Sequence, residues 1–576
     1  MAAMAALLDE LVAAGLRHIV LCPGSRSQAL ALLAADLERS GRVRLHVRVD
    51  ERSAGFLALG IGRQSGSPAA VIVTSGTAVG NLLPAAMEAH HAGVPLLLLT
   101  ADRPPELRGI GANQATSQPG MFSPFVRFET DAPVPVDAPE AVDAAETNGY
   151  RELARRAWRA ATAAPPGAVH VNLPVREPLA GAFPEWWSKP APKEESASDP
   201  AGGADLASAS DPAGGSDLAS ASDPVGGLDL ASASDPAGGS DLASASAPAR
   251  RAGPAASDEG PLGWDLPAHT LLVAGADAGP EAAVLAEDRG WPLVAEIVSG
   301  ARLGANVVPD YRAALRSPEL TDTIQRVAVI GHPTLTREVA RLLSRTDLDI
   351  VAVPATGERL NLNGRTRAAA LAQLWQAAPG DSAELERWLR GSDATVPAEA
   401  GISRTELVRA VWRASGPADR VLFGSSRLVR VADSVLEPRA VRVHANRGLA
   451  GIDGTIATAI GIDAAAEGGV TRVILGDLTL LHDAGSLLLP ADEPDPHVQL
   501  VVGNDGGGTI FDTLEVAGVA APEAFRRVQY TPQQVDLAAL ARAYGWEHVR
   551  VGSIDRLAEA LDPRHARCLI EVPLDR

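Results

Sequence analysis

The sequence predicts an α/β protein with three doubly wound, mostly parallel sheets. Two observations favour this fold class. Continuous apolar strands alternate with helical segments in three blocks, and a repeated polar tract separates the first block from the second. A length of 576 residues also suits three domains better than one core. We expect domains at 1–185, 263–400 and 401–576, with a linker at 186–262.

The first block begins with "MAAMAALLDELVAAG", which predicts an amphipathic helix that ends at Gly15. Asp9 and Glu10 interrupt the apolar run that a signal peptide needs. Ligands of such sheets bind beyond the carboxyl ends of the strands, so the loops after the strands are the candidate site. We expect strands at 17–22, 43–49, 69–74 and 95–100, and helices at 27–38, 51–64 and 79–91.

A tandem repeat follows the first block. Four copies of a 12-residue unit, such as "SASDPAGGADLA", fill residues 196–243. Each copy carries two Asp and no basic residue, so the tract contributes strongly to the net charge of -20. Its Ser, Gly, Pro and Ala cannot bury enough apolar surface to offset the ordering entropy. We therefore expect 186–262 to be a disordered acidic linker. A stacked solenoid is the alternative, but such copies would make a poor core.

The two later blocks differ in their loops. The loops of the second block hold few clustered polar residues, which indicates a structural middle domain. In the third block, unusual polar residues lie at the strand ends, where ligands bind. Strands are expected at 269–275, 291–297, 326–331 and 348–353 in the second block, and at 420–424, 440–445, 471–477, 497–505 and 566–572 in the third.

Composition excludes several classes of protein. Hydrophobic residues at 46% and charged residues at 21% are typical of a folded globular chain. Apolar runs such as 94–100 are too short for a membrane span. The excess of acid argues against nucleic acid as a partner. Two cysteines, Cys22 and Cys568, exclude a disulfide framework and a cysteine zinc site. We expect a cytoplasmic protein with no membrane and no nucleic-acid partner.

The third block contains the most informative motif. Gly476 and Asp477 end one strand, and Asn504 ends the next strand 27 positions after Asp477. Neighbouring parallel strands would bring the carboxylate and the amide oxygen together, and hard oxygen ligands suit Mg²⁺ bound to a diphosphate. The glycines at 506–508 would let the backbone approach that diphosphate closely. Either half alone would be an ordinary turn, but the two at this spacing predict a metal-diphosphate site.

Two features of the first block are ambiguous by themselves. Glu51 begins a helix directly after a strand, where the helix dipole stabilises a carboxylate, so it could be an ordinary first-turn acid. "CPGSRS" (22–27) predicts a tight turn with Ser25 as a possible helix cap and Arg26 exposed. "GIGRQSG" (60–66) is not a dinucleotide fingerprint, because its spacing is wrong and it lies late in a helix.

The third block also carries isolated polar candidates. Ser426 and Arg430 are four residues apart and so share one side of a predicted helix. Arg447 lies in a Gly-rich loop that ends a strand. Each arginine alone would more often be a solvated surface residue, and only their shared location favours a function.

Together these motifs resemble the thiamine diphosphate (ThDP) enzymes. Six segments are similar to motifs of the 2-succinyl-5-enolpyruvyl-6-hydroxy-3-cyclohexene-1-carboxylate (SEPHCHC) synthase family of menaquinone biosynthesis. They are "PGSRS", "DERSAGFLALG", "TSGTAVGN", "TADRPPELRGIGANQ", "NRGLAGIDG" and "GDLTLLHD". The resemblance covers the chain except 186–262. It implies pyrimidine-binding, middle and diphosphate-binding domains in that order. It also implies a homodimer or homotetramer with each active site at a subunit interface.

The resemblance also implies roles for individual residues. Glu51 would be catalytic, because it would hydrogen-bond the aminopyrimidine of ThDP and favour the tautomer that deprotonates the thiazolium. Asp477, Asn504 and the Gly506 carbonyl would hold Mg²⁺ or Mn²⁺. The other cofactor contacts would be Ser75, Gly76, Thr77, Asn81, Gly476, Leu478, Ile510 and Phe511. The substrate contacts would be Ser25, Arg26, Arg103, Asn113, Gln114, Ser426, Arg430 and Arg447, with Arg108 a weaker candidate.

The implied reaction is that of a transferase. It would decarboxylate 2-oxoglutarate and add the resulting carbanion 1,4 to isochorismate, giving SEPHCHC and CO₂. Both substrates are dicarboxylates, and guanidinium groups bind carboxylates bidentately. In an acidic protein a positive cleft would focus the field on such anions.

The sequence departs from the family pattern at two sites. Gln28, Ala29 and Leu30 follow the "PGSRS" turn where Thr-Pro-Leu is more usual. An extra residue, Thr509, separates the glycines from Ile510 and Phe511. Two alternatives to the family reaction stay open. One is another ThDP-dependent 2-oxo acid decarboxylase or acetohydroxyacid synthase-like enzyme. The other is a non-catalytic binding protein, which would have no use for Glu51.

Overall fold

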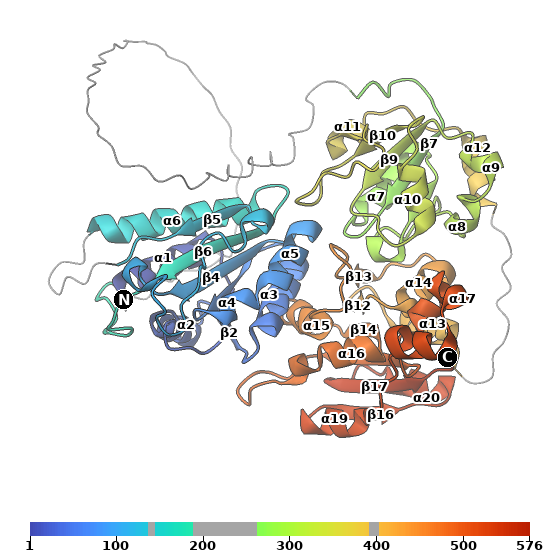
Figure 1. Cartoon of the computed structure of the whole chain (residues 1–576). Helices are drawn as coiled ribbons and strands as arrows, with labels where there is room; N and C mark the ends of the chain where they lie inside the picture. The colour runs from blue at the N-terminus through green and yellow to red at the C-terminus, as the bar shows by residue number, and fades with distance from the viewer. Residues whose placement is uncertain (136–143, 188–261, 391–401) are drawn as a thin grey trace, which may run out of the picture. The chain divides into compact units, whose positions relative to one another are not determined.

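The computed structural model describes residues 1–135, 144–187, 262–390 and 402–576. These residues form three parallel sheets with helices around them (Figure 1). The predicted α/β class is therefore confirmed. The expected linker at 186–262 falls almost entirely outside the described residues, as does the expected boundary at 400. Among the described residues, no helix combines the length and the apolar character needed to cross a bilayer.

The first sheet has six parallel strands in the order β2-β1-β3-β4-β6-β5. The four predicted strands are confirmed, and two more follow them. β6 is buried throughout, yet His170 and Asn172 interrupt its apolar run, and β5 lies at the sheet edge. The strands are β1 (His18–Leu21), β2 (Arg44–Val47), β3 (Ala69–Val73), β4 (Leu96–Asp102), β5 (Phe128–Asp131) and β6 (Ala168–Pro174).

Helices cover both faces of this sheet, because successive strand residues point to opposite sides. Val71 and Leu98 pack with α3 and α5, whereas Ile72 and Leu99 pack with α1, α2 and α6. The helix expected at 79–91 is in fact two, separated at Asn81, and Pro84 lies in the first turn of the second one. The helices are α1 (Ala2–Ala14), α2 (Gln28–Arg39), α3 (Glu51–Ser65), α4 (Thr77–Gly80), α5 (Leu83–Ala92) and α6 (Ala144–Thr162), with short 3₁₀ turns η1 (Pro105–Leu107) and η2 (Ser123–Phe125).

The second sheet has the order β11-β10-β9-β7-β8, with apolar clusters on both faces. Its strands are β7 (Thr270–Ala274), β8 (Leu293–Ala295), β9 (Arg326–Ile330), β10 (Asp349–Ala352) and the unpredicted two-residue β11 (Arg367–Ala368). β8 is shorter than expected because the chain turns into η3 (Ile297–Ser299). The helices are α7 (Glu281–Arg289), α8 (Tyr311–Ala314), α9 (Pro318–Thr321), α10 (Arg337–Leu343), α11 (Leu371–Leu374) and α12 (Ser382–Leu389).

The third sheet has the order β13-β12-β14-β15-β17-β16. Its strands are β12 (Arg420–Phe423), β13 (Arg442–His444), β14 (Thr471–Gly476), β15 (Val498–Asn504), β16 (Glu547–Arg550) and β17 (Cys568–Pro573). β14 and β15 are neighbours, with Gly476 opposite Gly503, as the motif spacing predicted. β16 was not predicted, because a polar edge strand has no apolar run.

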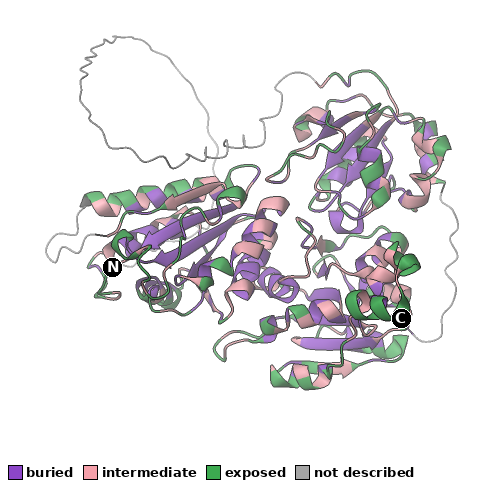
Figure 2. Ribbon diagram, viewed as in Figure 1, coloured by how far each residue is buried: buried purple, intermediate pink, exposed green. Residues whose placement is uncertain are grey.

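The helical segments around the third sheet are numerous and mostly short. They are α13 (Arg404–Ala414), α14 (Arg427–Val435), α15 (Thr455–Ala464), α16 (Asp477–His482), α17 (Val516–Val519), α18 (Pro522–Phe525), α19 (Leu537–Ala543) and α20 (Ile554–Ala560), together with η4 (Ala484–Leu487), η5 (Thr509–Thr513) and η6 (Arg526–Tyr530). Figure 2 shows the result: the central strands of all three sheets are buried, and many helices expose one side.

Glycines allow α3 and α15 to touch. A Cβ at Gly60 would lie 2.1 Å from the Thr458 carbonyl oxygen, and a Cβ at Gly461 would lie 2.0 Å from that of Leu57. No side chain fits at either position. The first glycine of "GIGRQSG" therefore serves helix packing, which agrees with the rejection of a dinucleotide fingerprint.

Candidate active site

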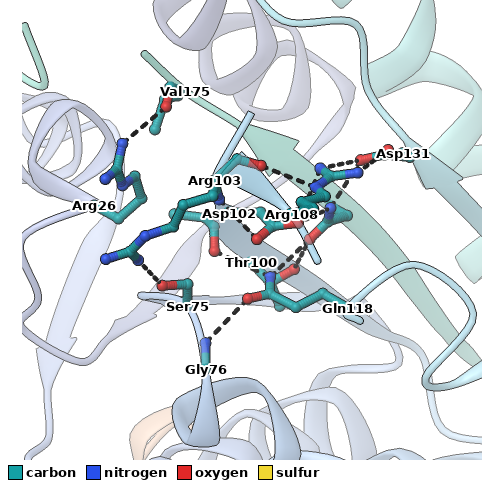
Figure 3. A network of polar contacts seen from close by, with 12 residues as sticks. Arg26, Ser75, Gly76, Thr100, Asp102, Arg103, Arg108, Gln118, Asp131 and Val175 are labelled. Atoms are coloured by element: carbon teal, nitrogen blue, oxygen red, sulfur yellow. Dashed lines mark hydrogen bonds and ion pairs between the residues drawn. The ribbon is translucent and has the colours of Figure 1, made fainter. Parts of the chain in front are cut away.

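Three loops meet at the carboxyl ends of β1, β3 and β4. The turn after β1 lies against the end of β3, because a Cβ at Gly24 would stand 2.3 Å from Thr74 Cβ. Ser75 Oγ donates a hydrogen bond of 3.0 Å to the Gln114 carbonyl oxygen, and Gln114 Nε2 donates one of 2.9 Å to the Ser75 carbonyl oxygen. Arg103 Nη1 also donates to Ser75 Oγ (Figure 3). The structure thus joins Ser75, Arg103 and Gln114, which lie far apart in sequence.

Arg26 and Arg103 form a buried pair of like charges. Arg26 was expected to be exposed, and this expectation is wrong: the residue is 9% exposed and its Nη1 donates to the Val175 carbonyl oxygen at 3.0 Å. Arg103 is 7% exposed, and burial together with the neighbouring Arg26 lowers its pKa. No carboxylate forms an ion pair with either guanidinium among the described residues. Such a pair is suited to bind an anion.

Arg108 differs from these two. It forms ion pairs of 2.9 Å with Asp102 and 2.6 Å with Asp131, and its Nε donates to the Arg103 carbonyl oxygen. The hydrogen bond that Arg108 donates to Asp131 raises the pKa of Arg108, although burial opposes it. Its charge is already neutralised, so the structure supports its lower rank as a substrate ligand.

Several predicted ligands of this edge are exposed. Ser25, Asn113, Gln114, Thr77 and Asn81 all lie at the surface of the chain. Ser25 is not the helix cap, because Ser27 occupies that position before α2, and Ser25 Oγ instead accepts from Gln28 Nε2 at 3.3 Å. These side chains are accessible to a cofactor, a substrate or a second subunit.

Glu51 is the first residue of α3. The preceding Asp50 caps the helix, accepting from the backbone N–H of Arg52 at 2.9 Å and of Ser53 at 3.3 Å. The Glu51 carboxylate is half-buried and has no hydrogen bond or ion pair with other described residues. Burial and then the nearby Glu51 carboxylate raise the pKa of Cys22. Glu51 therefore lies beside the end of β1 and is free to bind a ligand.

The predicted metal ligands meet at the third sheet. Asp477 is 5% exposed, and burial together with the neighbouring Asp505 raises its pKa to about 6. Asn504 Nδ2 donates to Glu571 at 3.0 Å, which leaves Asn504 Oδ1 toward the backbone N–H of Gly506 at 3.3 Å. Asp505 is itself paired with Arg404 at 2.7 Å, so the groups that fit a bound cation are the buried Asp477 carboxylate and the Asn504 amide oxygen.

The glycine-rich loop is braced by Tyr530. The Tyr530 hydroxyl donates to the Asp505 carbonyl oxygen at 2.8 Å, and the Gly508 N–H donates to the Tyr530 carbonyl oxygen at 2.7 Å. Gly506 has a φ of 73°, which favours glycine, and a Cβ at Gly507 would lie 2.4 Å from the Tyr530 carbonyl oxygen. The glycines therefore let the backbone of this loop pack closely against Tyr530.

The predicted metal site does not consist of clustered carboxylates and imidazoles. No group of three His, Cys, Asp or Glu able to hold a metal occurs in the described parts of the chain. An ion here would be bound by one carboxylate, the Asn504 oxygen, a backbone carbonyl and diphosphate oxygens, which is the ligand set Mg²⁺ accepts. Leu478 lies in α16 beside Asp477, and Ile510 and Phe511 lie half-buried in η5. Their cofactor contacts stay predictions.

A third group of predicted residues surrounds the start of α14. Ser426 caps this helix, accepting from the Leu428 N–H at 3.2 Å, and a Cβ at Gly476 would lie 3.8 Å from Ser426 Cβ. Burial, followed by the neighbouring Arg312, lowers the pKa of Arg430. Ser426 thus lies beside the metal motif, with Arg430 one helical turn further on.

Arg447 is held by the middle domain. It is 8% exposed, and its guanidinium donates to Thr334 Oγ1 at 3.1 Å and to the Thr334 carbonyl oxygen at 3.0 Å. Burial lowers its pKa, Glu296 opposes that effect, and Arg430 adds to it. The middle domain therefore contributes Thr334, which holds the guanidinium of a predicted substrate ligand, and its structural role stays a prediction.

The chain is similar in sequence to known protein families and to individual curated proteins. Residues 1–121 match the thiamine pyrophosphate enzyme, N-terminal TPP binding domain, and residues 428–570 match the thiamine pyrophosphate enzyme, C-terminal TPP binding domain. The 2-succinyl-5-enolpyruvyl-6-hydroxy-3-cyclohexene-1-carboxylate synthase of Leifsonia xyli subsp. xyli is 44% identical over 99% of this chain and 96% of its own. That of Clavibacter michiganensis subsp. michiganensis is 46% identical over 99% and 95%. That of Mycobacterium avium is 36% identical over 99% and 96%.

The chain belongs to the SEPHCHC synthase family. As a member of that family it is a ThDP-dependent transferase, and the predicted family, the fold class and ThDP as cofactor are confirmed. The two sheets that carry the polar residues are the two that match ThDP-binding domains.

Several residues near the candidate site of this SEPHCHC synthase family member were not indicated by the sequence. Asp505 follows Asn504 directly and could have been considered from its position alone. Gln118, Asn172 and Thr334 carry no local signal, because each contacts residues more than 15 positions away. Only the fold brings them to the site.

Proposed function

We propose that this protein decarboxylates 2-oxoglutarate and adds the resulting four-carbon unit 1,4 to isochorismate. The products would be SEPHCHC and CO₂, in menaquinone biosynthesis. When bound, ThDP supplies the nucleophile and the electron sink for this chemistry. The protein's part is to bind, orient and neutralise two dicarboxylate substrates beside it.

The observation that supports this proposal is that four arginines have no carboxylate partner in an ion pair. Arg26, Arg103, Arg430 and Arg447 are all predicted substrate ligands, and none forms an ion pair within the described residues. Arg26 lies beside Arg103, and Arg430 beside Arg447. Arg26, Arg103 and Arg447 are buried and Arg430 is half-buried, and like charges held this close cost stability unless an anionic ligand compensates them. Two such pairs suit two dicarboxylate substrates better than the smaller, less charged substrates of an acetohydroxyacid synthase-like enzyme.

The remaining roles follow from position. Glu51, free of other partners, would hold a hydrogen bond to the aminopyrimidine of ThDP. Asp477, Asn504 and the Gly506 carbonyl would hold Mg²⁺, or Mn²⁺, on the diphosphate. Gly476 and Leu478 would lie along the diphosphate, and Ile510 and Phe511 beside the thiazolium. Ser75, Gly76, Thr77 and Asn81 would contact the cofactor from the first sheet.

We also propose that the protein acts as a homodimer or homotetramer in the cytoplasm, with each active site between two subunits. Residues 1–185 would bind the pyrimidine end of the cofactor and 401–576 the diphosphate end, with 263–400 between them. The exposure of Ser25, Thr77, Asn81, Asn113 and Gln114 supports the shared site, because predicted ligands at the surface of one chain can be covered by another. Light scattering of the purified protein would measure the assembly.

One reaction tests the proposed function. Purified protein is supplied with ThDP, Mg²⁺, 2-oxoglutarate and isochorismate, and both CO₂ and the mass of the adduct are followed over time. We expect the two products to appear together. Release of CO₂ without adduct would point to a different 2-oxo acid decarboxylase, and absence of both would point to a non-catalytic protein.

A further inference from the structure

We propose that Gln118 is a positioning residue that fixes the turn at Gly76 for the cofactor. The inference rests on the proposed cofactor contacts of Ser75, Gly76 and Thr77. Gln118 is 0% exposed, and its Oε1 accepts from the Gly76 N–H at 3.0 Å. Its Nε2 donates to the Ala101 carbonyl oxygen at 3.1 Å and to Asn172 Oδ1 at 2.8 Å. One side chain therefore connects the ends of β3, β4 and β6.

The direction of the Gln118 amide is dictated by two carboxylates, those of the buried Asp102 and of Asp131 at the sheet edge. Asn172 Nδ2 donates to Asp102 at 2.9 Å and to Asp131 at 2.8 Å, and ionised carboxylates can only accept. Asn172 must therefore direct its side-chain oxygen toward Gln118, and Gln118 must donate to that oxygen from its NH₂ group. That leaves Gln118 Oε1 facing the Gly76 N–H. The chain from the two carboxylates to Gly76 has one consistent arrangement of donors and acceptors.

The turn that Gln118 holds is unusual and central. Gly76 has φ 80° and ψ -134°, and a Cβ there would lie 2.9 Å from Gln114 Cγ. Ser75, the preceding residue, accepts from Arg103 and donates to Gln114. Gln118 also holds the carbonyl group of Ala101, two residues before Arg103. It thereby sets the separation between the cofactor turn and a proposed substrate arginine.

Equilibrium binding of ThDP tests this role without requiring turnover. Titration calorimetry with ThDP in the presence of Mg²⁺ compares the full-length wild type with Gln118→Met, which keeps the volume but removes the hydrogen bonds. We expect the dissociation constant to rise about tenfold, the usual effect of leaving one buried polar group unsatisfied. The concentration of ThDP that half-activates the enzyme should rise in parallel, with a smaller change in kcat at saturating ThDP.

Gln499 provides a matched control. It is also 0% exposed, its Oε1 accepts from Arg472 Nε at 3.0 Å, and its Nε2 donates to the carbonyl oxygens of Asp562 at 2.8 Å and His565 at 3.1 Å. It lies near the start of β15, at the opposite end of the strand from Asn504. Gln499→Met should lower the melting temperature about as much as Gln118→Met but leave the dissociation constant for ThDP unchanged.

The outcomes separate the two proposals. Unchanged ThDP affinity in Gln118→Met, or equal weakening in Gln499→Met, would overturn the positioning role. Gln118→Glu is the second variant: it keeps the acceptor for Gly76 but turns an oxygen toward Ala101 and Asn172, and it should also bind ThDP more weakly. If neither Gln118 variant folds, the residue serves global stability and the inference fails. Normal ThDP binding by wild type without SEPHCHC formation would instead overturn the proposed reaction.

Discussion

Asp50 caps α3 and thereby leaves the next residue, Glu51, free of the helix end. The Asp50 carboxylate accepts from the first free backbone N–H groups, whereas Glu51 contacts none of them. Two adjacent acids thus have different tasks: one stabilises the helix, and the other is available for a ligand.

Glu51→Gln should therefore abolish most activity without unfolding the protein. We expect kcat to fall by about a hundredfold or more, as is usual when a proton-transfer partner is lost. The melting temperature should barely change, because the helix keeps its cap. Glu281→Gln is the matched control, since Glu281 is an exposed first residue of α7 far in sequence from the proposed site. Near-normal rates in Glu51→Gln would contradict the assigned role.

Arg430→Ala should weaken recognition of a dicarboxylate. Loss of a charged hydrogen-bonding group predicts a fall of kcat/KM by about tenfold or more, mainly through KM. Stability should hold or increase, because Arg430 has like-charged neighbours in Arg312 and Arg447. Steady-state kinetics with each substrate varied in turn would measure the effect, and the exposed Arg442→Ala is the control. An unchanged KM for both substrates would refute the assignment.

Asp477→Asn should have opposite effects on stability and on metal binding. The carboxylate is buried beside Asp505, which raises its pKa to about 6, so the ionised form destabilises the metal-free fold near neutral pH. The amide removes that repulsion and should raise the melting temperature of the metal-free protein. It should also weaken Mg²⁺-dependent binding of ThDP, measured by titrating Mg²⁺ or Mn²⁺ after treatment with a chelator. A variant that loses stability and keeps metal affinity would exclude Asp477 as a ligand.

Glu296 should make the folded state less stable as the pH rises. It is 0% exposed, and burial together with Asp433 raises its pKa to about 8. Between about pH 5 and 8 the unfolded chain releases a proton that the folded chain keeps, so this residue's contribution to the free energy of unfolding decreases, by up to about 1.4 kcal/mol per pH unit. Denaturant unfolding of wild type and Glu296→Gln across this range would measure the difference.

The glutamine variant should show the weaker pH dependence, because it has no carboxyl group to ionise. The substitution should also affect the contacts around residue 296. Glu296 accepts from the backbone N–H groups of Thr334 and Leu335, and Thr334 holds Arg447. Glu467→Gln, at an exposed position, controls for the loss of an acid. Equal pH dependence in wild type and Glu296→Gln would show that Glu296 is ionised in the folded protein.

The parts that could be predicted from the sequence are local. Apolar runs predicted the strands that carry the site, and the spacing of Asp477 and Asn504 predicted their meeting, because β14 and β15 are adjacent parallel strands. Edge strands such as β16 were missed, since their residues are polar. The break between α4 and α5 was also missed, because the apolar pattern runs through it.

The sequence by itself determined the family, the α/β class and the residue types of the candidate site, since short motifs and periodic burial are properties of neighbouring residues. Only the tertiary structure decided how those residues are held. It buried Arg26 against Val175, neutralised Arg108 and left Arg103 without a carboxylate. It also brought the Gln118 side chain into hydrogen-bonding distance of the Gly76 N–H, 42 residues away in the sequence. Hydrogen bonds over such separations depend on the packing of whole strands, which no local pattern of residues encodes.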